Sequence, residues 1–522
     1  MLQALRQERV RLCVIGAILA LFAAANVIGY RDSYPTLAAR LRFAAAFSDN
    51  PALRLFYGVP HDLASVAGYA EFRSVGLLSV IAAGWGVFAA VRVLRAEEDA
   101  GRYELVLAGA VTRRGAAAAV LAALAIESAA LWVACALALV IVGSVPGDIG
   151  VPQALGIAAA IVLPGALFAS VGALASQLAP THRGAEALGG ACIALALLVR
   201  VLADLVGGLG GLRLATPLGW AELIRPVTGF SPIALAALIA ATVLLAGLAV
   251  AIAGRRDVGT GLVPARATRR PRLYLLGSPA QAAVRGEWPT LVAWGVSAGT
   301  FALLIGGFSR RIAEEAAKAG LHPLGTTVLT ATAYLAFTFV FFTLVVTLFS
   351  ASRVGVMREE ESSGRLETLF ALPVSRRAWL AGRLAIAAAS TALLALFVGA
   401  CAWAGAAVGN AGVSATSLLE AGANAVPIGL LFLGVGSVLF LLAPRQSGGL
   451  TLTLVGVAFL WELVGALLGA PGWLLDVSPF HHIAAVPEHA FDVAGAIVML
   501  ALGAVGALVG VWGFAHRDLT SG

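Results

Sequence analysis

Long apolar runs alternate with short polar segments along the whole 522-residue chain. A helix needs about 20 predominantly apolar residues to cross the hydrocarbon core of a bilayer. Since an open strand edge would leave backbone groups unpaired in lipid, we expect each run to be a helix. The sequence therefore predicts an all-α polytopic membrane protein. Its twelve transmembrane helices are predicted near residues 12–30, 74–93, 116–143, 152–178, 187–209, 231–253, 288–308, 326–352, 379–409, 418–442, 449–470 and 492–514.

The composition excludes a water-soluble fold and an ATPase. Hydrophobic residues make up 60% of the chain and charged residues only 12%, whereas about a quarter of the residues of a soluble domain are charged. Lys318 is the only lysine, and it stands in the sequence Ala-Ala-Lys-Ala-Gly. The phosphate-binding loop of ATPases requires a Gly-Lys dipeptide. We therefore expect no catalytic site and no cofactor in this chain, and any ATP-driven work must depend on another subunit.

The distribution of arginines indicates the orientation. With both termini in the cytoplasm, the predicted cytoplasmic segments hold 24 arginines and the outer segments ten, which agrees with the positive-inside rule. Segment 254–286 is rich in Arg, Pro and Gly, and we interpret it as a basic cytoplasmic linker. It separates a first half, 1–253, from a second half, 287–522. Residues 2–11 and 278–287 are candidates for short interfacial helices.

A repeated polar segment relates the two halves. Residues 95–114 read RAEEDAGRYELVLAGAVTRR and residues 358–377 read REEESSGRLETLFALPVSRR. Ten of the twenty positions are identical, with a shift of 263 and no gap. The chain is therefore predicted to be a pseudo-dimer of two fused, similarly oriented six-helix halves. Two weaker echoes support the duplication, LAP at 178–180 and 442–444, and TPLGW at 216–220 with SPFHH at 478–482.

Each copy of the repeat lies between the second and third predicted spans of its half. Its charges predict a short helix, because Glu98 and Arg102, like Glu361 and Arg365, have the favourable i, i+4 spacing. The glycine that precedes each arginine permits a sharp turn. We therefore expect a rigid charged element on the cytoplasmic side of each half.

The next residues of the repeat lead into the third span. Thr112 and Ser375 stand where that span needs an N-cap, and paired arginines follow them at the membrane boundary. A solvated basic loop would explain a single copy. Two copies at matched positions favour docking of a dimeric partner with complementary charge.

This pattern resembles the type-2 permeases of ATP-binding-cassette exporters, above all the large two-repeat actinobacterial permeases described as polyketide-antibiotic or drug exporters. The resemblance covers essentially the whole chain. It implies a permease of the bacterial plasma membrane that exports hydrophobic or amphipathic compounds, such as polyketide-type antibiotics. The motifs that carry it are EEDAGRYELVLAGAVTRR and EEESSGRLETLFALPVSRRAW, with AGYAEFR at 67–73, TPLGWAELIRP at 216–226 and SPFHH at 478–482.

In that family this loop is the coupling helix that enters a groove of the nucleotide-binding subunit. The resemblance implies two copies of such an ATPase subunit as partners, which hold ATP and magnesium. Membrane lipid and a small apolar substrate are the other expected partners, and nucleic acid is not. Ala110 replaces the Pro373 of the second copy, so we expect a less rigid first loop and unequal ATPase contacts. The coupling role is implied for Glu97, Glu98, Gly101, Arg102, Glu104, Arg113, Arg114, Glu360, Glu361, Gly364, Arg365, Glu367, Arg376 and Arg377.

Four residues within the spans are candidates for the substrate pathway. Arg200 and Asp204 lie one helical turn apart in the fifth predicted span, and Trp461 and Glu462 lie at the comparable place in the eleventh. Charges inside a span are costly and usually face an interior or a pathway. The two interpretations are a local ion pair near the outer interface and a lining of the translocation route.

Two other groups of polar residues have simpler explanations. Asn26, in the first span, is predicted to form a hydrogen bond to a neighbouring helix. Two imidazoles and a carboxylate from the outer cluster could bind a metal, but adjacent histidines point in different directions and SPFHH already resembles a family loop. We therefore expect no metal site in that cluster, which consists of His481, His482, Glu488 and His489.

Two other functions compete with the exporter. A secondary transporter of the major-facilitator type also has six plus six spans and a basic central loop. Its Asp-Arg-x-Gly-Arg motif is partly imitated by residues 99–102, but the aspartate is Ser362 in the second copy. A membrane-embedded enzyme is the third possibility, and it is disfavoured because HExxH, GxSxG with partners and a plausible pair of catalytic carboxylates are not found.

Overall fold

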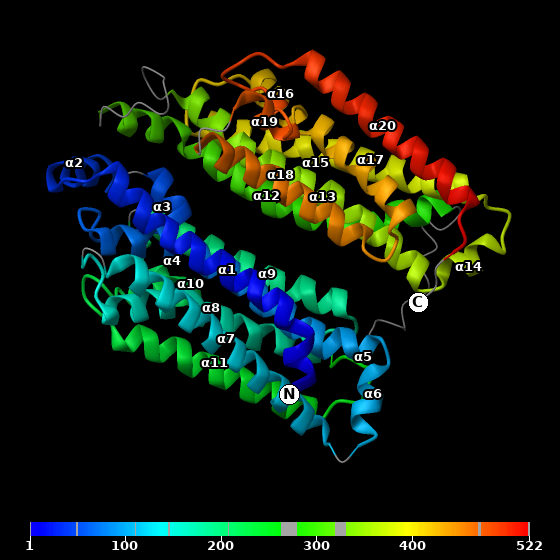
Figure 1. The fold of residues 1–522 in the computed structure, drawn as a ribbon, viewed down its shortest axis with the longest axis horizontal. Helices are drawn as coiled ribbons and strands as arrows, with labels where there is room; N and C mark the ends of the chain where they lie inside the picture. Colours follow the sequence, from blue (N-terminus) through cyan, green and yellow to red (C-terminus); the bar gives the residue numbers. More distant parts are fainter. Residues whose placement is uncertain are drawn as a thin grey trace. The chain divides into compact units, whose positions relative to one another are not determined.

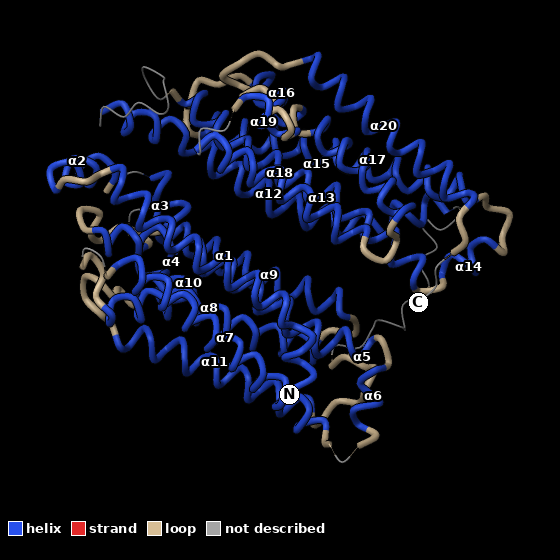
Figure 2. Tube along the Cα trace, in the orientation of Figure 1, coloured by secondary structure: helices blue, strands red, loops and turns tan. Residues whose placement is uncertain are grey.

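The computed structural model describes residues 2–48, 51–109, 111–144, 147–206, 208–262, 279–318, 330–467 and 471–519. Within these residues the regular elements are all helices, joined by loops, with no strand (Figure 2). Contacts divide the chain into two compact units, Met1–Arg269 and Arg270–Gly522. Their boundary falls within segment 254–286, of which residues 263–278, including the start of the interfacial helix expected at 278–287, lie outside the described residues.

The first unit begins with a long helix that already includes residues 2–11, so the interfacial helix expected there is the start of α1. The first unit also contains a π-helical turn, η1, and a 3₁₀ turn, η2. In chain order its elements are α1 (Leu2–Ser33), α2 (Leu37–Phe47), α3 (Pro51–Tyr57), α4 (Val66–Val91), η1 (Arg92–Ala96), α5 (Glu97–Asp99), α6 (Arg102–Leu107), α7 (Arg113–Gly143), α8 (Val151–Leu178), α9 (His182–Leu205), η2 (Gly210–Ala215), α10 (Pro217–Leu223) and α11 (Pro232–Ala253).

The second unit has a similar order of long helices with short ones between them. Its elements are α12 (Pro279–Lys318), α13 (Ala331–Ser362), α14 (Arg365–Phe370), α15 (Arg376–Val408), α16 (Ala415–Ala423), α17 (Val426–Leu442), α18 (Ser447–Leu467), α19 (Gly472–Leu475), the 3₁₀ turn η3 (Pro479–His482) and α20 (Val493–His516). The region predicted as one span at 418–442 is divided between α16 and α17 by a break at Asn424.

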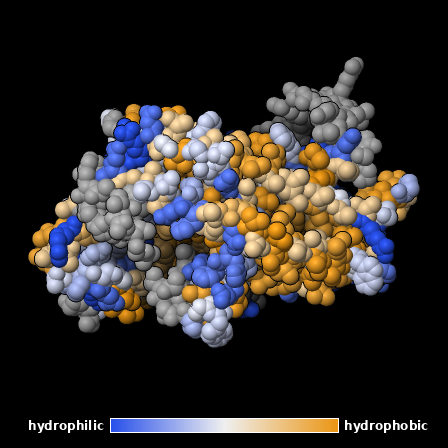
Figure 3. All heavy atoms as spheres, turned by 90° about the horizontal axis from the view of Figure 1, so that it is seen from above, coloured by the Kyte–Doolittle hydropathy of each residue, from blue (hydrophilic) through white to orange (hydrophobic). Residues whose placement is uncertain are grey.

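Eleven helices of the described residues are long and apolar enough to cross a membrane. The run predicted at 449–470 corresponds to α18, whose apolar part, Ser447–Glu462, is shorter; residues 468–470 lie outside the described residues. A polytopic all-helical membrane protein is therefore confirmed, whereas the count of twelve spans and the orientation of the termini stay predictions. In the space-filling view, hydrophobic residues cover much of the visible face and hydrophilic ones gather in separate patches (Figure 3).

Small residues let the long helices approach closely, as is common in membrane bundles. A Cβ atom on Gly86 of α4 would lie 2.1 Å from the backbone oxygen of Gly165 in α8, so neither helix could keep its place with a larger residue there. In the second unit, a Cβ atom on Gly434 of α17 would lie 2.2 Å from the oxygen of Gly503 in α20. These contacts fix α4 against α8 and α17 against α20.

The repeated loops lie at one end of their own units. In the first unit, α5 and α6 lie at the end that also carries the N-terminus, and α2 lies at the opposite end (Figure 1). In the second unit, α14 lies at the end that carries the C-terminus, and α16 and α19 lie at the opposite end (Figure 1). We call these the loop end and the far end of each unit.

Candidate functional site

The first repeat loop, residues 95–114, consists of short helical pieces that bend at one glycine. The π-helical turn η1 carries α4 into α5 without a break in direction. Gly101 then adopts a φ of +73° and starts α6. This left-handed conformation costs glycine little and other residues more. The predicted sharp turn is therefore confirmed; Ala110, on which the expected looseness of this loop depended, lies outside the described residues.

The second repeat loop, residues 358–377, bends at a glycine in the same way, although α13 runs to Ser362 as one continuous α-helix. Gly364 ends α13 with a φ of +71° and starts α14. The predicted N-caps are also confirmed in both loops. The Thr112 hydroxyl accepts a hydrogen bond from the Gly115 amide at 3.1 Å, and the Ser375 hydroxyl accepts one from the Ala378 amide at 3.2 Å. Each third span therefore starts at a fixed residue directly behind its loop.

The ion pair predicted between Glu98 and Arg102 is wrong. Arg102 instead pairs with Glu97, to whose two carboxylate oxygens its Nε and Nη2 donate at 2.8 Å. The physical reason is the left-handed turn at Gly101, which interrupts the helix between the two predicted partners and removes their i, i+4 register. The hydrogen bonds to the Glu97 carboxylate raise the pKa of the Arg102 guanidinium.

The ion pair predicted between Glu361 and Arg365 is also wrong, for the same reason. Arg365 Nε donates to the Ser363 hydroxyl at 3.0 Å. Glu360 pairs with Arg383 of α15. The two loops thus share their backbone path but neutralise their exposed charges differently, because the first loop holds its arginine in a carboxylate pair and the second does not.

Glu98 is the buried acid of the first loop. Its side chain is 3% exposed and lies between two arginines. Arg95 Nη1, from the preceding helical turn, lies 3.3 Å from Glu98 Oε1, and Arg256 Nη2, just beyond α11, lies 2.5 Å from Glu98 Oε2. The Gly259 amide donates to the same carboxylate at 2.6 Å. The side chain therefore bonds within its own unit.

Glu361 repeats this arrangement in the second loop. Its side chain is fully buried. Arg358 Nη1 lies 3.1 Å from Glu361 Oε2, and Arg517 Nη2, just beyond α20, lies 2.6 Å from Glu361 Oε1. The identical Glu pair of the two repeat copies therefore combines one half-buried residue with one buried residue.

Sequence reasoning missed Arg256 and Arg517 as functional candidates. Both were visible as the arginines that directly follow the last span of each half, where they count toward the positive-inside bias. Nothing in the spacing connects them to the repeat, because the partner glutamates precede them by 158 and 156 residues. Only the fold brings the end of the last span beside the loop.

A separate set of repeat residues faces outward. Leu105 of the first loop and Leu372 of the second are large apolar side chains with 77% and 58% of their surface exposed. Charged side chains alternate with them on the same two loops. The outward charged set consists of Arg102, Glu104 and Arg114 in the first loop and Arg365, Glu367 and Arg377 in the second.

Arg200 and Asp204 belong to a closed network at the far end of the first unit. Arg200 is 1% exposed; its Nη1 donates to the Gly76 carbonyl at 2.9 Å and lies 3.2 Å from Glu222 Oε1. Asp204 accepts a hydrogen bond from Arg213 at 2.6 Å. These bonds join α4, α9, η2 and α10, which favours the interpretation as a local ion pair.

Trp461 and Glu462 are partly exposed at the far end of the second unit. Trp461 Nε1 donates to the Leu474 carbonyl at 2.9 Å, and Glu462 Oε1 lies 3.1 Å from His481 Nδ1. His482 Nε2 lies 2.8 Å from the Asp476 carbonyl oxygen. His481 Nε2 also lies 3.8 Å from Asp476 Oδ1, so both histidines lie beside Asp476, and only His481 contacts Glu462.

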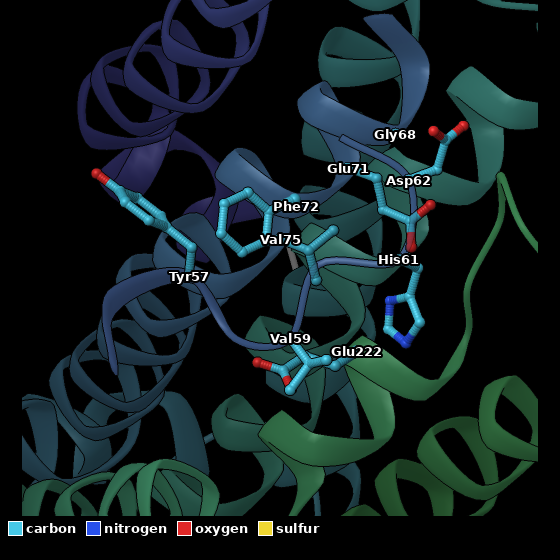
Figure 4. A pocket seen from close by; sticks show the side chains of 9 residues that line it. All are labelled: Tyr57, Val59, His61, Asp62, Gly68, Glu71, Phe72, Val75 and Glu222. Atoms are coloured by element: carbon cyan, nitrogen blue, oxygen red, sulfur yellow. The ribbon is translucent and has the colours of Figure 1, made fainter. Parts of the chain in front are cut away.

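A small pocket opens beside the Arg200 network. Figure 4 shows Asp62, Glu71 and His61 gathered on one side and the rings of Tyr57 and Phe72 on the other. Burial raises the pKa of Glu222 to about 8, although the Arg200 guanidinium acts in the opposite direction. The pocket is lined by Tyr57, Val59, His61, Asp62, Gly68, Glu71, Phe72, Val75 and Glu222.

One prediction about helix packing is confirmed. Asn26 of α1 donates through Nδ2 to the Ser74 hydroxyl of α4 at 3.4 Å. A polar side chain in a span thus finds a partner on the neighbouring helix, as the cost of an unsatisfied amide in lipid requires.

Comparison with known proteins gives one family. A family model described as "Multidrug efflux system permease Rv1217c, C-terminal domain" matches residues 4–253 and 276–515. A relative from Mycobacterium tuberculosis, described as "Multidrug efflux system permease protein Rv1217c", is 30% identical over 523 aligned residues. The alignment covers 99% of this chain and 94% of that relative. The residues between the two matched segments lie within the predicted linker.

Proposed function

Because this chain belongs to the family of the multidrug efflux permease Rv1217c, we propose that it is the permease subunit of an ATP-binding-cassette exporter. Two copies of an ATPase subunit bind its two repeat loops from the cytoplasm. ATP and magnesium stay in those subunits, and this chain supplies the path through the plasma membrane. The observation that carries the proposal is the pair of loops with matched construction and outward charges.

The outward residues of the loops are suited to a protein groove. Arg102 and Glu104, like Arg365 and Glu367, bring opposite charges together on a short helix whose position is fixed by a glycine turn. Charge arranged in this way selects a partner and its register more than it adds affinity. The exposed Leu105 and Leu372 supply apolar contact at the same surface.

The energy of transport comes from the partner. Tighter binding of ATP to a closed pair of ATPase subunits favours one state of the permease, and hydrolysis restores the other. The two halves then rock between inward-open and outward-open arrangements. The spans carry few charges, so the cargo is an apolar or amphipathic compound of the drug or polyketide-antibiotic type.

A secondary transporter of the major-facilitator type is the alternative. Asp99, which would be the acidic residue of its loop motif, is already held inside the first unit: Arg95 Nε lies 3.1 Å from Asp99 Oδ1, and the His182 amide donates to Asp99 Oδ2 at 2.7 Å. The second loop has Ser362 at this place. The contacts of Asp99 and the serine in the second loop therefore favour ATP over an ion gradient as the source of energy.

A double variant of outward residues tests the proposal. Glu104→Arg with Glu367→Arg reverses one exposed charge on each loop, and we expect loss of ATPase co-purification and of ATP-driven drug transport in reconstituted vesicles. The matched control is Glu420→Arg, an exposed charge reversal on α16, which should transport normally. Glu98 and Glu361 are unsuitable for this test because an arginine there would be buried beside two others.

Three results would contradict the proposal. Undiminished ATP-driven transport by the double variant would remove the loops from coupling. Drug transport by the purified chain alone, driven by a proton or sodium gradient, would establish the alternative. Failure of the unmodified chain to bind an ATPase subunit encoded beside it would remove the partner altogether.

A further inference from the structure

One arginine at the loop end of each unit joins elements that are far apart in the sequence. Arg256 follows α11, and Arg517 follows α20. Each bonds to the buried glutamate at the entry of its repeat loop, as described above. Each is therefore placed between the last long helix of its unit and the loop that the proposed function assigns to ATPase binding.

The last residues of each repeat loop also bond to Arg256 or Arg517. Arg113 Nη1, at the start of α7, donates to the backbone carbonyl of Arg256 at 2.5 Å. Arg376 Nη1, at the start of α15, donates to the carbonyl of Arg517 at 2.6 Å. Both ends of a repeat loop are thus bonded to one residue, through its side chain at the entry and its backbone at the exit.

A fourth element is attached through the guanidinium. Arg256 Nε donates to Gln177 Oε1 at 3.1 Å, at the end of α8. The guanidinium carbon of Arg517 lies 5.1 Å from the ring centre of Phe440, at the end of α17. The two units thus hold this arginine by different chemistry, a hydrogen bond at the end of α8 and a cation–π contact at the end of α17.

The loops are also attached through apolar side chains near these arginines. Leu366 of α14 is 2% exposed and belongs to one buried cluster with Trp379, Phe440 and Phe514. Arg517 lies over the ring of Phe514 as well, 5.4 Å from its centre.

The first loop is attached by further hydrogen bonds instead. Arg95 Nη1 donates to the Thr260 carbonyl at 3.1 Å, and Arg95 Nη2 donates to the Pro180 carbonyl.

We propose that Arg256 and Arg517 are positioning residues that transmit movement of each repeat loop to two long helices of the same unit. These helices are α8 and α11 in the first unit and α17 and α20 in the second. This inference rests on the proposed function, because it takes the ATPase as the source of loop movement. A buried ion pair that loses one partner leaves an uncompensated charge. The loop, the start of the following span and the ends of the two other helices therefore move as one body.

The test separates coupling from folding. Arg256→Met and Arg517→Met keep most of the side-chain volume and remove the charge; Arg256→Lys and Arg517→Lys keep the charge and remove the forked donor geometry. Arg255→Met is the matched control, since Arg255 is adjacent and exposed. Each variant is purified with the ATPase subunit, and three quantities are compared at equal amounts of folded protein: ATPase bound, drug-stimulated hydrolysis, and drug transported per ATP.

The expected result is a change in only one of those quantities. The methionine variants bind ATPase and hydrolyse ATP, but their drug transported per ATP falls about tenfold, within the range of ordinary coupling between sites. The drug transported per ATP by the lysine variants lies between the values for the methionine variants and the unmodified chain. Arg255→Met transports as much drug per ATP as the unmodified chain. Should a methionine variant fail to fold, the lysine variant of the same position gives the comparison.

Two results would overturn the inference. Unchanged transport per ATP in folded variants of both positions would show that the loops act without these arginines. A parallel loss of ATPase binding and transport, at constant transport per ATP, would assign them to the docking surface. Absence of ATPase binding by the unmodified chain contradicts the proposed function instead, so the two failures are distinguishable.

Discussion

Glu97 and Glu98 are neighbours in the sequence and have different surroundings in the structure. Glu97 pairs with Arg102 at the surface, whereas Glu98 is buried between Arg95 and Arg256. A local sequence pattern gives no means of telling them apart, because the helical phase at this point depends on the left-handed turn that follows. In each copy of the repeat, the first acid is thus half-buried and the second is buried.

Neutralising a buried acid of the repeat should destabilise the protein. Glu98→Gln leaves Arg95 and Arg256 without their shared carboxylate, and breaking a buried pair in this way costs about 3–5 kcal/mol. Thermal unfolding of the purified protein in detergent measures the effect as a lower melting temperature. Glu104→Gln, an exposed acid of the same loop, is the control. Equal melting temperatures for the two variants would contradict the buried pair.

The exposed arginines of the two loops should differ in importance. Arg102 is engaged by Glu97 through two hydrogen bonds, whereas Arg365 bonds to a neutral hydroxyl. Under the proposed function, Arg365→Gln weakens ATPase binding more than Arg102→Gln does, because only the former removes a charge that is not already neutralised within its loop. Titration of the ATPase subunit against each variant measures this difference. Equal losses would contradict the distinction between the loops.

Glu222 should make stability depend on pH. Burial raises its pKa to about 8 in the folded protein, while an unfolded glutamate titrates near its ordinary value of about 4.3. Between these values the folded state holds a proton that the unfolded state has released, so the contribution of this group to stability decreases as pH rises from about 4.3 to 8. Glu222→Gln should remove this part of the slope when melting temperature is followed across pH. An unchanged slope would contradict the raised pKa.

At the scale of elements, the long apolar helices were predictable and the short ones were not. The runs near 116–143 and 152–178 correspond closely to α7 and α8, because a length of apolar sequence suffices to specify a span. α2, α3 and α10 were missed, since each is too short for a span and contains charged or polar residues. The caps and glycine turns of the loops followed from local chemistry, while the arginine partners of Glu98 and Glu361 required the tertiary fold.

The glycine turns of the loops give a prediction for whole elements. A residue with a side chain at Gly101 or Gly364 must adopt a left-handed conformation, at a cost of about 1–2 kcal/mol. Gly101→Ala with Gly364→Ala should therefore loosen α6 and α14 and increase protease cleavage within both loops. The control is Gly84→Ala with Gly355→Ala, inside α4 and α13, where an added Cβ meets no atom within 4 Å. Equal cleavage of both double variants would contradict the strain at the turns.

At the scale of the whole molecule, matched hydrogen bonds extend the likeness of the two units beyond the repeat. The Thr216 hydroxyl donates to the Ala196 carbonyl at 3.0 Å, and the Ser478 hydroxyl donates to the Ala458 carbonyl at 3.0 Å. Both members of the second pair lie 262 residues further along the chain. The echo of TPLGW in SPFHH thus has a structural meaning, since the first residue of each motif bonds the start of a short helical segment to the preceding span.

The predicted orientation is testable with single cysteines in a background without Cys13, Cys135, Cys192 and Cys401. We expect Arg102→Cys and Arg365→Cys to react with a membrane-impermeant maleimide only from the cytoplasmic side. Trp473→Cys, at an exposed residue of α19 at the far end, should react only from the outer side. Right-side-out and inside-out vesicles distinguish the two. Reaction of the two loop positions from opposite sides would exclude halves with the same orientation.

The same shift that relates these hydrogen bonds places Glu462 where the first unit has Arg200. One half thus presents a cation and the other an anion at equivalent places. Two separately encoded copies of either half would contain the same residue at this position, in duplicate. Joining the halves in a single polypeptide fixes the stoichiometry, so that every molecule contains one of each. A pair of identical halves could not have this difference.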